Sequence, residues 1–200
     1  KDRYVTSGGA KVGDAIIVTK GAAIEGTAIF AIELQRLLKE RLGADLVERA
    51  RKFLEEISIA REASLAMETG GVTAMHDATE GGVAGALQEL AIASNLGVRA
   101  YEDEIFVRPE TEAICKILGA DPMRTISSGT LVIAASAAKA PAIVGNLASH
   151  GVRAFAIGEF TDREKGMWLI RRDGSKLDLS EPIQDQLWAI LGKHLKEYGL

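Results

Sequence analysis

The sequence contains one cysteine, Cys115, and this scarcity excludes whole classes of protein. A single cysteine can form neither an internal disulfide nor a cysteine-based zinc cluster, which fits a reducing compartment. The motifs HExxH, CxxC and GxSxG are also absent. The sequence therefore gives no support to a zinc enzyme or to a hydrolase with a serine nucleophile elbow.

Long apolar runs and a dominant sign of charge are missing as well. No apolar run reaches the roughly 18 residues of a membrane span, and no signal peptide is visible. The 24 Lys and Arg and 28 Asp and Glu give a net charge of −4, so the whole chain has no general attraction for nucleic acid or anionic membranes. We therefore predict a cytoplasmic protein whose partners include neither.

Strands and helices alternate along most of the 200 residues. Apolar and β-branched runs predict the strands, and apolar stripes at helical spacing, ended by glycines, predict the helices. Expected strands are 15–19, 72–75, 98–101, 131–136 and 152–160, and a hairpin turns at Asp173-Gly174. Expected helices are 23–42, 44–69 with a break near Ser58, 83–95, 108–118, 139–150 and a last one capped by Ser180. This order predicts an α/β (α+β) domain in which helices cover a mixed sheet.

The segment HDATEGG, residues 76–82, joins an expected strand to an expected helix. A helix start offers free N–H groups and a positive dipole end, which together attract anions. Gly81 and Gly82 would let a phosphate or another backbone approach closely, and Asp77 could hold a magnesium ion that accompanies phosphates. Alternatively, Asp77 and Glu80 have the spacing of a capping box, or Thr79 caps the helix. Capping leaves the two glycines unexplained.

Three other polar features have a functional and a structural interpretation. His76 is either a phosphate contact or a partly buried residue at a strand end. Ser127, Ser128 and Gly129 either donate to an anion or form a turn before a buried strand. Cys115, among apolar neighbours and without an adjoining histidine or basic cluster, is expected to be a buried structural cysteine.

Four segments, taken in order, resemble a known family. They are TSGGAKVGDAIIVTKGAAIEGTAIFA, MHDATEGGVAGALQELA, SSGTLVIA and AIGEF, within residues 5–161. They are similar to the C-terminal domain of the aminoimidazole ribonucleotide synthetase superfamily, particularly to HypE-like hydrogenase expression/formation proteins. The resemblance implies a three-layer α/β/α domain with a mixed sheet and partial ferredoxin-like topology. Residues 1–200 would form one domain. In it, 1–14 lead in from an absent N-terminal domain and 162–200 add the hairpin and last helix.

The resemblance also implies an activity. Members use ATP and Mg²⁺ to activate an oxygen of an amide-, carboxylate- or phosphate-type substrate. HypE-like proteins dehydrate a carbamoyl thioester to make the cyanide ligand of nickel–iron hydrogenase. The intact protein would be a homodimer with a carbamoyl-transfer partner. The nucleotide-binding role of the Asp-x-Thr-x-Gly-Gly stretch falls on Asp77, Thr79, Gly81 and Gly82, and no catalytic residue is assigned.

The sequence departs from the HypE-like pattern in two places. That pattern ends in a cysteine that carries the carbamoyl group, whereas this sequence ends HLKEYGL. Ala78 and Glu80 also stand where proline and arginine are common, and Glu80 competes with a phosphate for the helix start. Two alternatives therefore remain. One is another enzyme of the superfamily, a phosphoribosyl-amidine cyclase or a small-molecule kinase. The other is a non-catalytic nucleotide-binding or assembly module.

Overall fold

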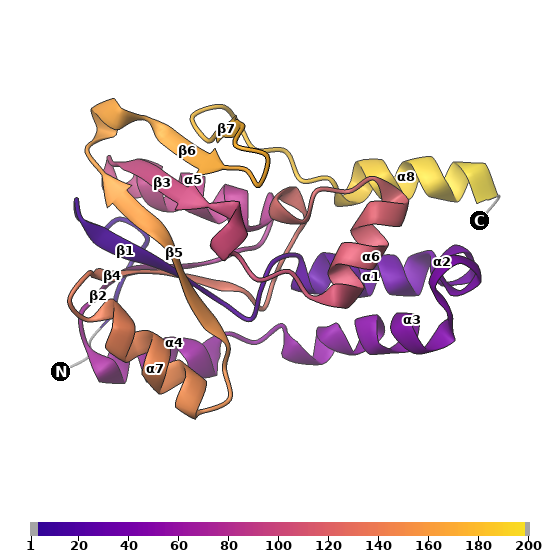
Figure 1. Cartoon of the computed structure of the whole chain (residues 1–200), viewed down its shortest axis with the longest axis horizontal. Helices are drawn as coiled ribbons and strands as arrows, with labels where there is room; N and C mark the ends of the chain where they lie inside the picture. Colours follow the sequence, from indigo (N-terminus) through magenta and orange to yellow (C-terminus); the bar gives the residue numbers. More distant parts are fainter. Residues whose placement is uncertain (1–3, 199–200) are drawn as a thin grey trace.

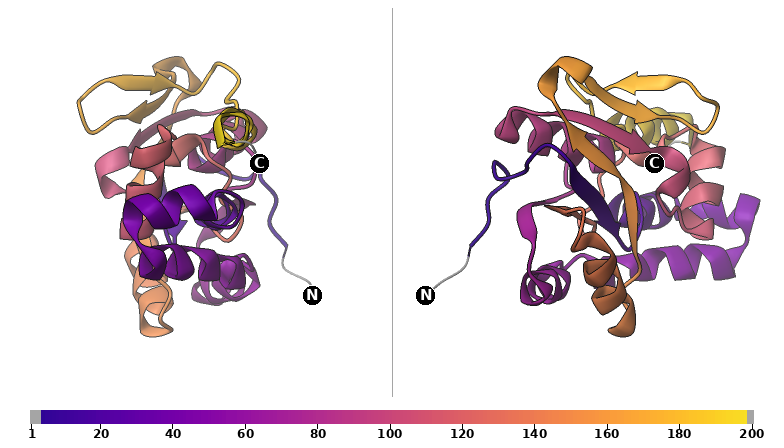
Figure 2. Two further views of the ribbon diagram at one scale, coloured as in Figure 1. Left: turned by 90° about the vertical axis from the view of Figure 1, so that its right-hand side faces the viewer. Right: turned by 60° about the vertical axis from the view of Figure 1, so that its left-hand side comes forward.

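The computed structural model describes residues 4–198, and a seven-stranded sheet forms its centre (Figure 1). The strand order is β2-β4-β1-β5-β3-β6-β7, and every pairing is antiparallel except the parallel pair β3–β6. The strands are β1 (Asp14–Thr19), β2 (Val72–Asp77), β3 (Gly97–Tyr101), β4 (Leu131–Ser136), β5 (Ala154–Thr161), β6 (Met167–Ile170) and β7 (Lys176–Asp178). The hairpin β6–β7 forms one edge (Figure 2), and β2 forms the other.

Helices cover both faces of this sheet. Helix α5 (Gly82–Ser94) packs on one face, and α4 (Ala60–Thr69) and α7 (Ala140–Ser149) pack on the other. The remaining α-helices form a lobe beyond the end of the sheet (Figure 1): α1 (Ile24–Glu33), α2 (Gln35–Leu42), α3 (Ala44–Arg51), α6 (Pro109–Leu118) and α8 (Leu187–Tyr198). The predicted mixed sheet between helical layers is therefore confirmed.

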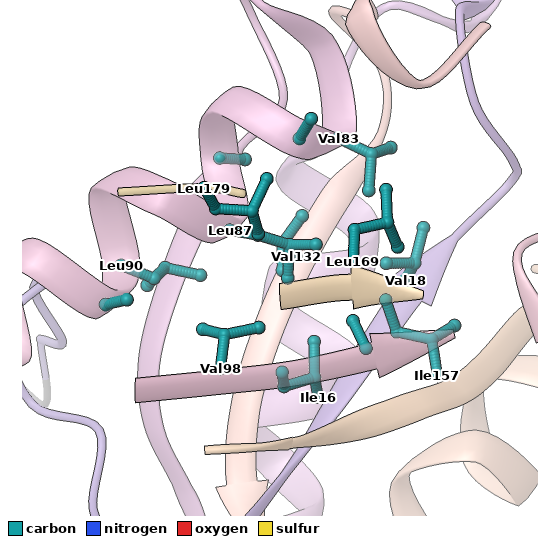
Figure 3. Packing of buried hydrophobic residues seen from close by; sticks show 14 of the residues in the cluster. Ile16, Val18, Val83, Leu87, Leu90, Val98, Val132, Ile157, Leu169 and Leu179 are labelled. Carbon is teal, nitrogen blue, oxygen red and sulfur yellow. The ribbon is translucent and has the colours of Figure 1, made fainter. Parts of the chain in front are cut away.

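The main core lies between α5 and the sheet (Figure 3). Side chains at helical spacing on α5, Val83, Leu87 and Leu90, meet alternating strand residues such as Ile16 and Val18, and all are 0–1% exposed. Each such side chain contributes about 1.5–3 kcal/mol on burial. This packing fixes the start of α5 against the sheet. Among the described residues, no helix is both long and apolar enough to cross a membrane.

Two predicted helices differ from the observed ones. Residues 23–42 form two helices separated at Leu34, because Leu34 leaves helical geometry while its side chain stays buried. The predicted cap at Ser180 is wrong. Ser180 donates to Asp178 instead, and α8 begins only at Leu187, whose amide donates to Asp185 Oδ1 at 2.8 Å. The expected break near Ser58 is confirmed between a short 3₁₀ helix, η1 (Lys52–Glu56), and α4.

Candidate functional site: the start of helix α5

The four predicted nucleotide-binding residues lie at one junction. Strand β2 ends at Asp77, which pairs with Leu131 of β4, and α5 begins at Gly82. Gly81 occupies the N-cap position with φ of 74°, and Gly82 donates to the carbonyl of Thr79 at 3.0 Å. The predicted caps were Asp77 and Thr79, but the N-cap residue of α5 is Gly81, which has no side chain. The capping interpretation is therefore wrong. Sequence reasoning therefore located the junction but not its hydrogen bonds.

The two glycines at this junction are explained by other parts of the same chain. A Cβ added at Gly82 would overlap the carbonyl oxygen of Thr125 and come within 3.0 Å of that of Met123. A Cβ at Gly81 would lie 3.1 Å from Cγ2 of Ile183. Both glycines also have positive φ, which other L-residues rarely adopt. Of the two roles considered for them, close approach of another backbone is observed at Gly82, whereas Gly81 faces the side chain of Ile183.

An anionic side chain sits at the start of α5. The amide of Gly81 donates to Oδ2 of Asp185 at 2.9 Å, over a separation of 104 residues. Gln88 of α5 holds the same segment, because its Nε2 donates to the carbonyls of Leu179 and Glu181 at 2.6 and 2.7 Å. We call residues 179–186 the strap. No local pattern indicates the strap, because the last helix was expected to begin after Ser180 and in fact begins at Leu187.

His76 and Asp77 form a small polar cluster beside the junction. The Nε2 atom of His76 contacts the carboxylate of Glu89 on α5, and its Nδ1 lies 3.4 Å from Oδ1 of Asp77. The side chain of Asp77 is 44% exposed, so one of its oxygens can reach a ligand from solvent. No group of three or more His, Cys, Asp or Glu side chains within residues 4–198 could hold a metal ion.

The segment ISSGTL is a structural turn, as one of its two interpretations predicted. Ser127 is fully buried, and its hydroxyl accepts the amide of Ile24 at 2.9 Å and contacts the Thr130 hydroxyl at 2.7 Å. Its backbone runs beside the junction, because Ser127 donates to Ala78 O and Ala78 donates to Thr130 O, both at 2.9 Å. The turn therefore supports the end of β2.

Cys115 is buried in α6 and serves as a structural residue. Burial, with a smaller contribution from the charge of Asp121, raises the pKa of its thiol to about 12. A thiol that stays protonated is a poor nucleophile. The prediction of a structural cysteine agrees with this environment.

Together, the fold and the junction define an α/β domain in which a strand leads, through two glycines, into a helix whose first amides attract an anion. The family profile of the AIR synthase related protein, C-terminal domain, matches residues 11–168. The chain therefore belongs to this family, as the resemblance of its segments predicted.

Similar proteins include several with roles in hydrogenase maturation. A Methanocaldococcus jannaschii protein, named for hydrogenase expression and formation, is 34% identical over 178 residues, 88% of this chain and 50% of that protein. The carbamoyl dehydratase HypE of Escherichia coli is 32% identical over 179 residues, 88% of this chain and 49% of HypE. The chain thus spans about half the length of the curated relatives it matches.

Solved structures confirm the fold class. The crystal structure of E. coli HypE aligns with a TM-score of 0.76 and 28% identity, over 95% of this chain and 56% of HypE. A HypE structure in complex with ATP aligns with a TM-score of 0.69 and 23% identity, over 93% of this chain and 55% of that chain. A structure of a HypE–HypF complex aligns with a TM-score of 0.69 and 22% identity, over 89% of this chain and 56% of that chain. The last two likenesses concern the fold alone.

Proposed function

We propose that this chain is the C-terminal half of a HypE-like maturation factor that uses ATP to activate and dehydrate a carbamoyl thioester. Curated relatives named carbamoyl dehydratase align over most of the chain, and this supports the reaction type. Because the chain spans about half of their length, residues 1–14 would lead in from a preceding domain. Residues 162–200 would add the hairpin and α8 to this one. The intact protein would be a cytoplasmic homodimer.

The observation that carries the nucleotide-binding part of the proposal is the carboxylate of Asp185 on the amide of Gly81. A carboxylate oxygen at a helix start is a stand-in for a phosphate oxygen, because both are anions that accept backbone N–H bonds. The next amides of α5, those of Val83 and Ala84, have no acceptor within the described part of the chain. In the proposed complex, a phosphate of ATP takes the place of the Asp185 carboxylate, and the strap moves aside.

Asp77 and Thr79 would assist the nucleotide from the same side of the junction. Mg²⁺ takes oxygen ligands in near-octahedral geometry and usually retains waters beside one or two carboxylates and substrate phosphates. Asp77 fits the role of one such carboxylate, because its side chain is partly exposed. No group of three or more His, Cys, Asp or Glu side chains among the described residues could hold the ion, so the phosphates, water and residues of the N-terminal domain would complete the coordination. The ion would neutralise phosphate charge, and this would offset the repulsion from Glu80.

The partner in this proposal is a protein that delivers the carbamoyl group. Its support is a solved HypE–HypF assembly, whose HypE chain has the same fold as this domain. The chain itself gives no assignment of the surface that such a partner would contact.

The test uses the intact protein, with its N-terminal half restored. We expect ADP release from magnesium-ATP only when a carbamoyl thioester on a protein cysteine is supplied, with formation of a thiocyanate detected by mass spectrometry. Asp77→Asn should lower this rate, whereas Asp45→Asn, on the exposed surface of α3, should leave it unchanged. ATP consumption with a phosphoribosyl amide or a small-molecule alcohol instead would favour another superfamily enzyme. A lack of ATP binding by the intact protein would favour a non-catalytic assembly module.

A further inference from the structure

A second site candidate is a cavity of about 670 Å³, lined by other parts of the chain than the α5 junction. Its walls come from the end of β1, from α3, η1 and the start of α4, and from the loops before α6 and before β5. No residue of 76–82 or of the strap lines it. Its volume lies within the roughly 300–1,000 Å³ that is usual for small-molecule sites.

Most of the charge in the walls of this cavity is already neutralised. Lys20 is buried, and its ammonium contacts Glu62 Oε1 and the carbonyls of residues 56 and 58 at 2.7–2.8 Å. Both oxygens of Glu56 accept from the guanidinium of Arg108, at 2.8 and 2.6 Å. Three ion pairs result: Lys20–Glu62, Arg108–Glu56 and Arg49–Glu110. These pairs hold the walls in place, and the charges of their three cations are already neutralised.

Two arginines of the cavity are different. Neither Arg61 nor Arg153 has a carboxylate partner among residues 4–198. Arg61 donates through Nη2 to the carbonyl of His150 at 2.8 Å, and Arg153 lies over the ring of Phe106 at 4.8 Å. A guanidinium stacked on an aromatic ring keeps its N–H edge free, and that edge fits a carboxylate or phosphate. Both groups adjoin the loop 150–153, so positive charge is concentrated there.

The walls of the cavity also include the aromatic rings of Phe53 and Phe106. Phe106 lies 5.7 Å from Phe155, and the buried ring of Phe53 carries the guanidinium of Arg108 at 4.4 Å. Glu55, which forms no ion pair among residues 4–198, adds negative charge to the η1 wall. A polyphosphate would be repelled by this carboxylate, whereas a ligand with one anionic group beside the arginines would not.

From this arrangement we propose that the cavity binds a small organic molecule with a single oxyanionic group, a phosphate monoester or a carboxylate. Arg61 and Arg153 hold the oxyanion, and the apolar part of the ligand lies on Phe106. This site is independent of the α5 junction and of the ATP-dependent reaction proposed above.

The test is a titration of the nitrogen-15-labelled chain, followed through the backbone amides and the arginine Nε–H signals. The probes are phenyl phosphate, benzoate and the neutral benzyl alcohol. We expect phenyl phosphate or benzoate to shift the signals of Arg61, Arg153 and loop 150–153 saturably, and which of the two binds more tightly identifies the oxyanion. Benzyl alcohol should bind more weakly than either.

Matched variants separate this site from general attraction of anions. The double substitution Arg61→Gln/Arg153→Gln should weaken binding about tenfold or more, because charge-assisted hydrogen bonds are lost. Arg36→Gln/Arg41→Gln on α2 removes the same charge from an exposed surface and should have no effect. Urea unfolding verifies that both double variants fold. Equal affinity in the two, shifts confined to the start of α5, or no saturable binding of either anion would overturn the proposal.

Discussion

Replacing Gly82 by alanine tests why glycine stands at the start of α5. The residue has φ of 60°, and an added Cβ would overlap the carbonyl oxygen of Thr125. The left-handed backbone costs a non-glycine residue about 1–2 kcal/mol. Forcing an atom into a closely packed position adds about 1–3 kcal/mol. We therefore expect Gly82→Ala to lower the free energy of unfolding by about 2–5 kcal/mol.

Gly119 provides the matched control. It has φ of 70° at the end of α6, and a Cβ there would meet nothing within 4 Å. Gly119→Ala should therefore cost only the backbone term of about 1–2 kcal/mol. Both variants are unfolded in urea, and their unfolding free energies are compared if the dependence on urea concentration has the same slope. The difference between the two losses then measures the cost of the contact with the 123–125 backbone. If the two variants were equally stable within about 0.5 kcal/mol, contact with this backbone would not explain the glycine.

Three further predictions concern stability and reactivity. Cys115 should not react with a thiol reagent at neutral pH in the folded chain and should react fully in urea, because burial raises its pKa to about 12; rapid native reaction would contradict its placement. The Arg108 hydrogen bond lowers the pKa of Glu56 below its ordinary 4.5, so this contribution to stability is present above about pH 4.5 and is lost as pH falls through the folded-state pKa. Unfolding curves should accordingly show that Arg108→Gln costs more at neutral pH than in acid, and a pH-independent cost would refute the pairing. Gly145→Ala, where α7 leaves space around the added Cβ, should raise stability by about 0.5–1 kcal/mol, and a lower unfolding midpoint would contradict this.

Local patterns were enough to predict most of the fold. The apolar run at 131–136 and the alternation at 152–160 are strand signals that need no knowledge of distant residues, and the structure has strands at Leu131–Ser136 and Ala154–Thr161. The last helix was predicted to begin too early for a physical reason. Ile183 has the four-residue spacing of Leu187 and Leu191, which fits a helix, but its side chain packs against Gly81 instead. That contact spans about a hundred residues and leaves no trace in the local pattern.

In the candidate site, too, the features set by neighbouring residues could be predicted and the contacts between distant residues could not. The strand, the glycines and the helix of HDATEGG are consecutive, so the junction and the positions of Asp77 and Gly82 could be predicted. The acceptor of the Gly81 amide could not, because Asp185 reaches it only through the packing of the strap on Gln88. Likewise, the backbone at Thr125 that makes Gly82 necessary belongs to a loop in which no motif signals such a contact.

The most direct test of the central proposal is a titration of the nitrogen-15-labelled chain with magnesium-ATP, following the amides of Gly81 and Gly82 in the wild type and in Asp185→Asn. The variant keeps the shape of the strap but removes the competing charge. Phosphate binding at the start of α5 predicts saturable shifts of both amides, with higher affinity in Asp185→Asn, while Asp173→Asn in the β6–β7 turn behaves as the wild type. If neither amide shifted at millimolar ATP in either protein, or if the affinity did not depend on Asp185, the start of α5 would not be the phosphate site.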